Sequence, residues 1–159
     1  MTGKTHMAGG LFVGVIISQQ AGLDLKDSAI VTTVSVVGSL LPDIDTTQSK
    51  MGRALLPLSI IVSVFVGHRK LTHSLFLWPS LGLIAYAAFP EYWPHVLGCV
   101  TGCISHVILD AFTAEGVPIF YPFPKKFSLI GVKTGGVLDI GLGVALIMAA
   151  GAIGYQMFA

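Results

Sequence analysis

Two histidines, two fixed cations and two hydroxyl side chains lie together in residues 68–74, His-Arg-Lys-Leu-Thr-His-Ser. Apolar runs flank this segment, and only 11% of the chain is charged. Ionisable groups beside such runs are costly to bury and commonly mark a site. Imidazoles of His68 and His73 are potential metal ligands, and the guanidinium of Arg69 can bind two phosphate oxygens at once. Thr72 or Ser74 would suit the cap of a following helix.

His106 and Asp110 form a second group of chemically capable residues. Residues four apart project from the same face of a helix, one turn from each other. An imidazole and a carboxylate at this spacing make a compact two-ligand platform for a first-row divalent metal. A structural hydrogen bond between the two side chains is the alternative interpretation.

Asp43 and Asp45 follow Pro42 at the end of an apolar run. Proline disfavours helix in the residue before it, so we expect these carboxylates on irregular backbone. One of them can bind metal directly, while the other is a further ligand, a general base or a group that orients a histidine. A simple helix-ending turn is the alternative, because proline and aspartate are common there.

The predicted ligands outnumber the four that one zinc ion takes, so we expect one or two divalent ions, zinc or manganese. Two such ions can activate a water and stabilise a leaving oxygen in phosphoester hydrolysis. The predicted metal ligands are His6, Asp43, Asp45, His68, His73, His106 and Asp110. The predicted catalytic residues are Asp45, Arg69 as the phosphate-binding group, and Asp139 near the start of the last apolar run. No HExxH motif or nucleophile-elbow pattern appears in the sequence.

The composition indicates an integral membrane protein. Hydrophobic residues make up 53% of the 159-residue chain, and the mean hydropathy is +0.82. We expect one domain over residues 1–159, because no linker or repeat interrupts the pattern. The net charge of +1 gives no reason to expect a nucleic-acid partner. Cys99 and Cys103 share a helix face, where small packing residues are a simpler interpretation than ligands.

The apolar runs predict an all-α, polytopic helical bundle with about five spanning helices. Residues 54–67 form a run of 14 interrupted by Pro57, which we expect to be re-entrant or interfacial. The expected spanning helices are residues 5–23, 28–42, 75–89, 96–112 and 137–158.

This topology places every candidate ligand on one side of the membrane and His95 on the other. The same side receives every lysine and arginine except Lys26, so the positive-inside rule predicts a multi-pass protein of the cell membrane with a cytoplasmic site. A basic rim would also attract phosphate headgroups, which makes a membrane lipid or a lipid-linked phosphate the expected substrate.

These motifs resemble the YdjM-type membrane-bound, metal-dependent hydrolases of bacteria and archaea. The resemblance rests on His6 before the first helix, on residues 41–45 (Leu-Pro-Asp-Ile-Asp), on residues 68–74, and on His106 with Asp110. It implies a metal-dependent hydrolase. The order of these motifs is more weakly similar to zinc-dependent phospholipase C and P1-type nucleases, which are soluble, all-helical and trinuclear. The chain lacks their further histidines and their N-terminal tryptophan ligand.

The sequence therefore predicts a membrane-embedded, metal-dependent phosphoesterase. Two other classes remain open: a non-enzymatic metal carrier or sensor, and a structural membrane protein whose polar residues pair with one another. A carrier would favour ligands near the bilayer midplane within broken helices. Here the candidate ligands lie near helix ends.

Overall fold

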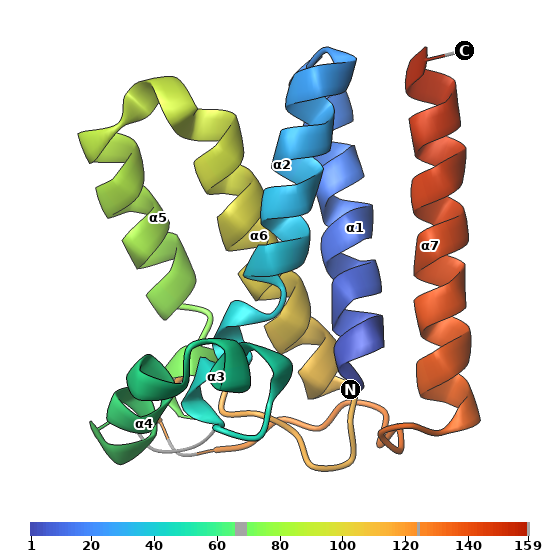
Figure 1. Ribbon diagram of the computed structural model, residues 1–159. Helices are drawn as coiled ribbons and strands as arrows, with labels where there is room; N and C mark the ends of the chain where they lie inside the picture. Colours follow the sequence, from blue (N-terminus) through green and yellow to red (C-terminus); the bar gives the residue numbers. More distant parts are fainter. Residues whose placement is uncertain (66–69, 124, 159) are drawn as a thin grey trace.

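A computed structural model describes residues 1–65, 70–123 and 125–158, and all the regular elements in these ranges are helices (Figure 1). The α-helices are α1 (Gly3–Gln20), α2 (Leu25–Gly38), α3 (Lys50–Ala54), α4 (Leu56–Phe65), α5 (Leu77–Ala88), α6 (Trp93–Ala111) and α7 (Val137–Phe158). Three short 3-10 helices connect them: η1 (Leu41–Asp45), η2 (Leu71–His73) and η3 (Pro90–Tyr92).

Five helices, α1, α2, α5, α6 and α7, run up and down through the molecule (Figure 1). The short helices α3 and α4 lie at one end, beside the start of α1 and the loop that joins α6 to α7. Because the long helices alternate in direction, this one end collects the start of α1, the segment after α2, the segment before α5 and the end of α6. We call this end of the bundle the site end.

Three segments in the described part of the chain are long and apolar enough to cross a membrane: Leu25–Asp45, Pro90–Ala111 and Val137–Phe158. The sequence predicted about five spanning helices. Helix α1 has 18 residues and α5 has 12, and neither is among these three candidates. Helix α4 has ten residues, about 15 Å of helix, which is too short for a hydrocarbon core of about 30 Å.

The helix ends follow local signals in the sequence. Thr2, Asp24 and Ser49 cap α1, α2 and α3, each through a side-chain oxygen that accepts a backbone N–H. Helix α2 was expected to reach residue 42 but ends at Gly38, and the chain continues as the 3-10 helix η1. The last helix has the predicted limits, 137 and 158. The other predicted helix limits differ from the observed ones by one to three residues.

Glycines allow α6 to pack closely on α2. A Cβ atom on Gly102 would lie 2.2 Å from the carbonyl oxygen of Ser35, and one on Gly38 would lie 2.5 Å from that of Cys99. Small residues at such contacts are typical of helix packing in membranes, where close van der Waals approach holds helices together. Cys103 is fully buried, and its thiol donates to the Gly38 carbonyl at 3.2 Å, which supports a packing role for it.

Candidate metal centre

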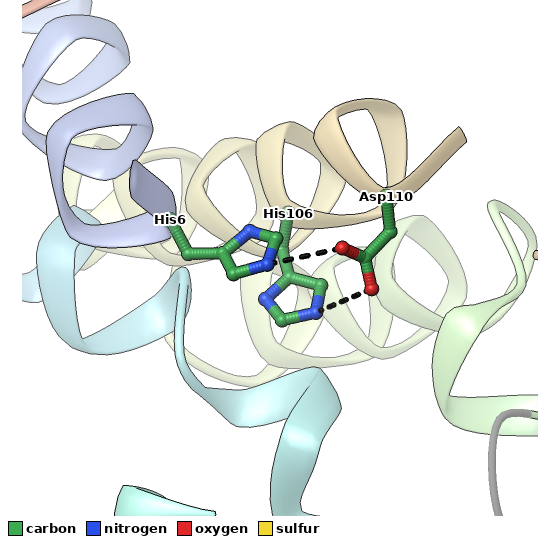
Figure 2. A group of neighbouring side chains, drawn as sticks. All are labelled: His6, His106 and Asp110. Atoms are coloured by element: carbon green, nitrogen blue, oxygen red, sulfur yellow. Dashed lines mark ion pairs between the residues drawn. The ribbon is translucent and has the colours of Figure 1, made fainter. Parts of the chain in front are cut away.

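Four elements bring imidazoles and carboxylates together at the site end. Helix α6 contributes His106 and Asp110 from its last two turns, and the first turn of α1 contributes His6 (Figure 2). Asp43 comes from η1 and His73 from η2. The three imidazoles are 1% exposed or less and Asp110 is 2% exposed, so the cluster is screened from water. The side chain of Asp43 is 27% exposed and lies at its open side.

His106 is held by the backbone at the end of α2. Its Nδ1 lies 2.7 Å from the carbonyl oxygen of Ser39, an acceptor, so Nδ1 carries the proton in this contact. In the neutral ring the lone pair is then on Nε2. This Nε2 lies 3.6 Å from Asp43 Oδ1 and 3.5 Å from Asp110 Oδ2. A histidine fixed in this way through its far nitrogen is typical of metal ligands.

His73 is held in the same manner by a carboxylate and a hydroxyl. Its Nδ1 lies 3.6 Å from Asp45 Oδ2 and 3.1 Å from Thr72 Oγ1, and the Thr72 hydroxyl donates to Asp45 at 2.7 Å. The indole N–H of Trp78 donates to the Thr72 carbonyl at 2.8 Å and fixes this turn. Burial disfavours the charged ring, but the neighbouring carboxylates of Asp110 and Asp45 favour it more strongly, so the pKa of His73 is raised.

Four atoms, two imidazole nitrogens and two carboxylate oxygens, make up what we call the four-atom site. Three of the residues, Asp43, His73 and His106, form a group whose ligand atoms lie within 4.8 Å of one another. His73 Nε2 lies 3.8 Å from Asp43 Oδ1 and 3.6 Å from Asp110 Oδ2, and His106 Nε2 lies at 3.6 and 3.5 Å from the same two oxygens. A tetrahedral zinc ion with ligands at about 2.0–2.1 Å holds neighbouring ligand atoms about 3.3–3.4 Å apart. The four separations exceed this spacing by only a few tenths of an ångström.

The two imidazole nitrogens that face this site, His73 Nε2 and His106 Nε2, are buried, and neither has a hydrogen-bond partner among the residues that the structure describes. The same is true of His6 Nδ1. A buried polar atom without a partner costs about 1–3 kcal/mol, so such atoms need an explanation. A divalent cation would accept the lone pairs of His73 Nε2 and His106 Nε2 and offset the charges of Asp43 and Asp110. The donor set therefore fits a metal ion.

His6 lies against the other carboxylate oxygen of Asp110. Its Nε2 lies 3.1 Å from Asp110 Oδ1, and its ring stacks on that of His106 with centroids 3.6 Å apart (Figure 2). His6, His106 and Asp110 form a second group whose ligand atoms lie within 4.8 Å of one another. The Met1 ammonium also contacts Asp110 Oδ1. The two carboxylate oxygens of Asp110 therefore face different partners, as in a carboxylate that bridges two positions.

The structure brings five predicted ligands together: His6, Asp43, His73, His106 and Asp110. His68 and Arg69 lie outside the described residues. The sequence prediction left Asp45 as a ligand, as the general base or as a group that orients a histidine. The structure places it at Nδ1 of His73, on the far side of the ring from the other carboxylates, which supports the orienting role.

Asp139 corrects one expectation. Its carboxylate lies at the site end but accepts from the Thr5 hydroxyl, from the Thr2 N–H at 3.0 Å and from the Gly135 N–H at 2.8 Å. These contacts tie the starts of α1 and α7 together, and no contact joins Asp139 to the imidazoles within the described chain. Geometry gives no support to a catalytic role for it. His95 lies at the other end of α6, as predicted.

Sequence reasoning missed two of the groups that fix the imidazoles, the Ser39 carbonyl and the Thr72 hydroxyl. The Ser39 carbonyl carries no sequence signal, because any residue supplies one. Thr72 or Ser74 was expected to cap the next helix. Thr72 instead binds Asp45 and His73, and α5 starts after Phe76 without a side-chain cap. Ser74 Oγ accepts from the Phe76 N–H at 3.2 Å. The position of Thr72 directly before a candidate ligand was the available signal.

The whole chain, residues 1–159, matches the family model for the YdjM inner membrane protein. The chain belongs to the YdjM family. It is 34% identical to the protein YvsG of Bacillus subtilis (strain 168) over 159 residues, covering 99% of this chain and 97% of YvsG. It is 35% identical to the inner membrane protein YdjM of Escherichia coli (strain K12) over 99 residues, 60% of this chain and 50% of that protein.

A further relative, YfhP of Bacillus subtilis (strain 168), is 29% identical over 137 residues, which are 80% of this chain and 39% of YfhP. No solved structure matches the chain. The comparisons give no support to the weaker resemblance to zinc-dependent phospholipase C. Membership of an inner-membrane family agrees with the apolar helices and identifies this YdjM-family chain as a multi-pass membrane protein.

Proposed function

We propose that this YdjM-family protein is a membrane-embedded, metal-dependent hydrolase that cleaves a phosphoester of a phospholipid or of a lipid-linked phosphate. One observation carries the proposal. Within the described chain, the buried Nε2 atoms of His73 and His106 have no hydrogen-bond partner, and they face the oxygens of Asp43 and Asp110 at 3.5–3.8 Å. Purely structural polar residues would be expected to satisfy one another, and these nitrogens do not.

His73, His106 and Asp110 would hold the ion from the buried side. A divalent ion bound there would lower the pKa of a coordinated water and stabilise negative charge on a phosphoryl oxygen. Catalytic zinc sites keep one position open, and Asp43, the exposed member, lies where water and substrate would enter. Asp43 would complete the ligand set or accept the proton of the attacking water.

One ion would occupy the four-atom site, and zinc or manganese suits its mixture of imidazole and carboxylate ligands. A second ion would use His6 and the other oxygen of Asp110. In that case Asp110 would bridge the two ions, as its contacts on both oxygens suggest. His106 Nε2 can serve only one of them, so the second position is poorer in ligands among the described residues.

We place the site end at the cytoplasmic face and all five long helices across the membrane. The segments that carry Lys4, Lys50, Arg53, Lys70, Lys125, Lys126 and Lys133 lie at the site end, and α2 begins with Lys26 at the other. This distribution follows the positive-inside rule. It also surrounds the cluster with cations that attract lipid phosphate, and Arg69 is the proposed phosphate-binding residue.

The location of the cluster distinguishes this proposal from a metal carrier. Carriers bind ions near the bilayer midplane, in broken helices that can expose the site to either side. Here the ligands lie at one end of the bundle, on the last turns of α6 and on the short helices η1 and η2. A lipid substrate that diffuses in the membrane can reach such a position with its headgroup.

The test is hydrolysis of defined lipid phosphates by the purified protein in detergent micelles. We expect the protein to release phosphate or a phosphomonoester from the lipid. A metal chelator should stop this release, and added Zn²⁺ or Mn²⁺ should restore it. Asp110→Asn is the matched inactive variant, because it removes the carboxylate shared by all three imidazoles. Metal binding without turnover on any phospholipid or lipid-linked phosphate would favour a carrier or sensor and overturn the hydrolase assignment.

A further inference from the structure

A groove lies between the first half of α7 and the start of α1, separate from the four atoms of the metal centre. Its volume is about 540 Å³, within the range of sites for small organic ligands. Ile140, Val144 and Ile147 of α7 form one wall, and Ala8 of α1 belongs to the other. Gly143 of α7 also lines the groove, and a Cβ atom there would lie 3.3 Å from Thr5 Oγ1 of α1.

The groove changes from apolar to basic along its length. Its apolar part lies along α7, a candidate membrane span whose outer side chains are largely exposed, so in a bilayer the groove opens toward hydrocarbon. Lys4 and Lys50 lie at the site end of the groove. Lysines at the end of a membrane helix lie at headgroup depth. The groove therefore combines an apolar channel with a cationic end.

The positive charge at this end has no acidic partner within the described chain. No ion pair involves Lys4 or Lys50 there, and Lys50 Nζ donates to Met7 Sδ at 3.9 Å. Asp139 lies close by but is fully buried, and its carboxylate already accepts hydrogen bonds from Thr2, Thr5 and Gly135. An occupant that carries a negative group would supply the missing charge.

We propose that this α1–α7 groove binds an anionic phospholipid of the surrounding bilayer, with an acyl chain along Val144 and Ile147 and its phosphate between Lys4 and Lys50. Helix α7 packs chiefly on α1, at the edge of the bundle (Figure 1). A lipid in this position would contact α1, α3 and α7 together and stabilise the packing of α7 on the bundle. Because a ligand that binds only the folded state stabilises it, bound lipid raises the unfolding temperature.

The experiment compares thermal unfolding of the full chain in a neutral detergent with added phosphatidylglycerol or phosphatidylcholine. We expect phosphatidylglycerol to raise the unfolding temperature by several degrees and phosphatidylcholine by clearly less. Lys4→Gln with Lys50→Gln should abolish this difference. Lys125→Gln with Lys126→Gln removes the same charge from the exposed α6–α7 loop and should preserve it. Equal responses of the two double variants would overturn the proposal.

A second pair of variants tests the apolar part. Val144→Trp fills the groove, whereas Met148→Trp places the same side chain at a position that is 70% exposed and outside it. Native mass spectrometry should detect retained phosphatidylglycerol on the wild type and on Met148→Trp, and much less on Val144→Trp. The proposal does not rest on hydrolase activity. We therefore expect phosphatidylglycerol to raise the unfolding temperature of the Asp110→Asn variant by the same amount as that of the wild type. Loss of retained lipid in both tryptophan variants, or in neither, would contradict a site in this groove.

Discussion

His106→Ala is expected to remove bound metal almost completely and to abolish hydrolysis. His106 belongs to both candidate ligand groups, and its Nε2 is one of the two partnerless imidazole nitrogens at the four-atom site. Loss of an outer partner of a metal ligand typically weakens affinity about 10–100-fold, so loss of the ligand itself should exceed that. The measurement is metal content of the purified protein by mass spectrometry, together with a zinc titration.

His95→Ala is the matched control for this variant. It removes the same side chain from the same helix, eleven residues or about 16 Å away along the axis. His106→Gln is a second variant, since its amide can still donate to the Ser39 carbonyl and preserve folding. Normal metal content in both His106 variants, or equal loss in His95→Ala, would show that the cluster does not hold the ion.

Asp45→Asn has the second-largest expected effect, a loss of about 10–100-fold in metal affinity with the protein still folded. Asp45 contacts Nδ1 of His73 at 3.6 Å and accepts from the Thr72 hydroxyl at 2.7 Å. Its negative charge favours the tautomer that presents a lone pair at Nε2. An amide keeps the shape of the side chain but removes this charge, so the weaker affinity should appear in a competitive zinc titration.

Asp139→Asn makes the same substitution in a buried carboxylate at the same end of the bundle. Its partners are Thr2, Thr5 and Gly135 rather than an imidazole, so we expect unchanged metal affinity and a lower unfolding temperature. A similar loss of metal affinity in Asp139→Asn would support the catalytic role that the sequence predicted for Asp139. Unchanged affinity in Asp45→Asn would mean that His73 needs no orientation by this carboxylate.

Two features of the site could be predicted from the sequence, one from helix periodicity and one from membrane topology. The spacing of His106 and Asp110 places them on one helix face, and the structure has them in contact at 3.5 Å. Alternating helix directions place His6 and Asp43 at the same end of the bundle. Both inferences use regular geometry, which depends little on the details of packing.

The sequence predicted different roles for Asp43 and Asp45, but it could not show which of the two faces the other ligands, because that depends on the 3-10 conformation of η1. In that short helix the two carboxylates reach opposite nitrogens of His73, at 3.8 and 3.6 Å. An extended backbone would have pointed them apart. Asp139 likewise shares the end of the bundle with the ligands, but its bond to Thr5 depends on how α7 packs against α1.

X-ray absorption spectroscopy of the purified wild-type protein, together with its metal content, tests the metal centre most directly. We expect at least one bound zinc or manganese ion per chain, with two imidazole ligands and carboxylate oxygens in its first coordination shell. Protein that binds no divalent ion at micromolar concentration, or an ion coordinated by cysteine sulfur, would contradict a centre built from His73, His106, Asp43 and Asp110.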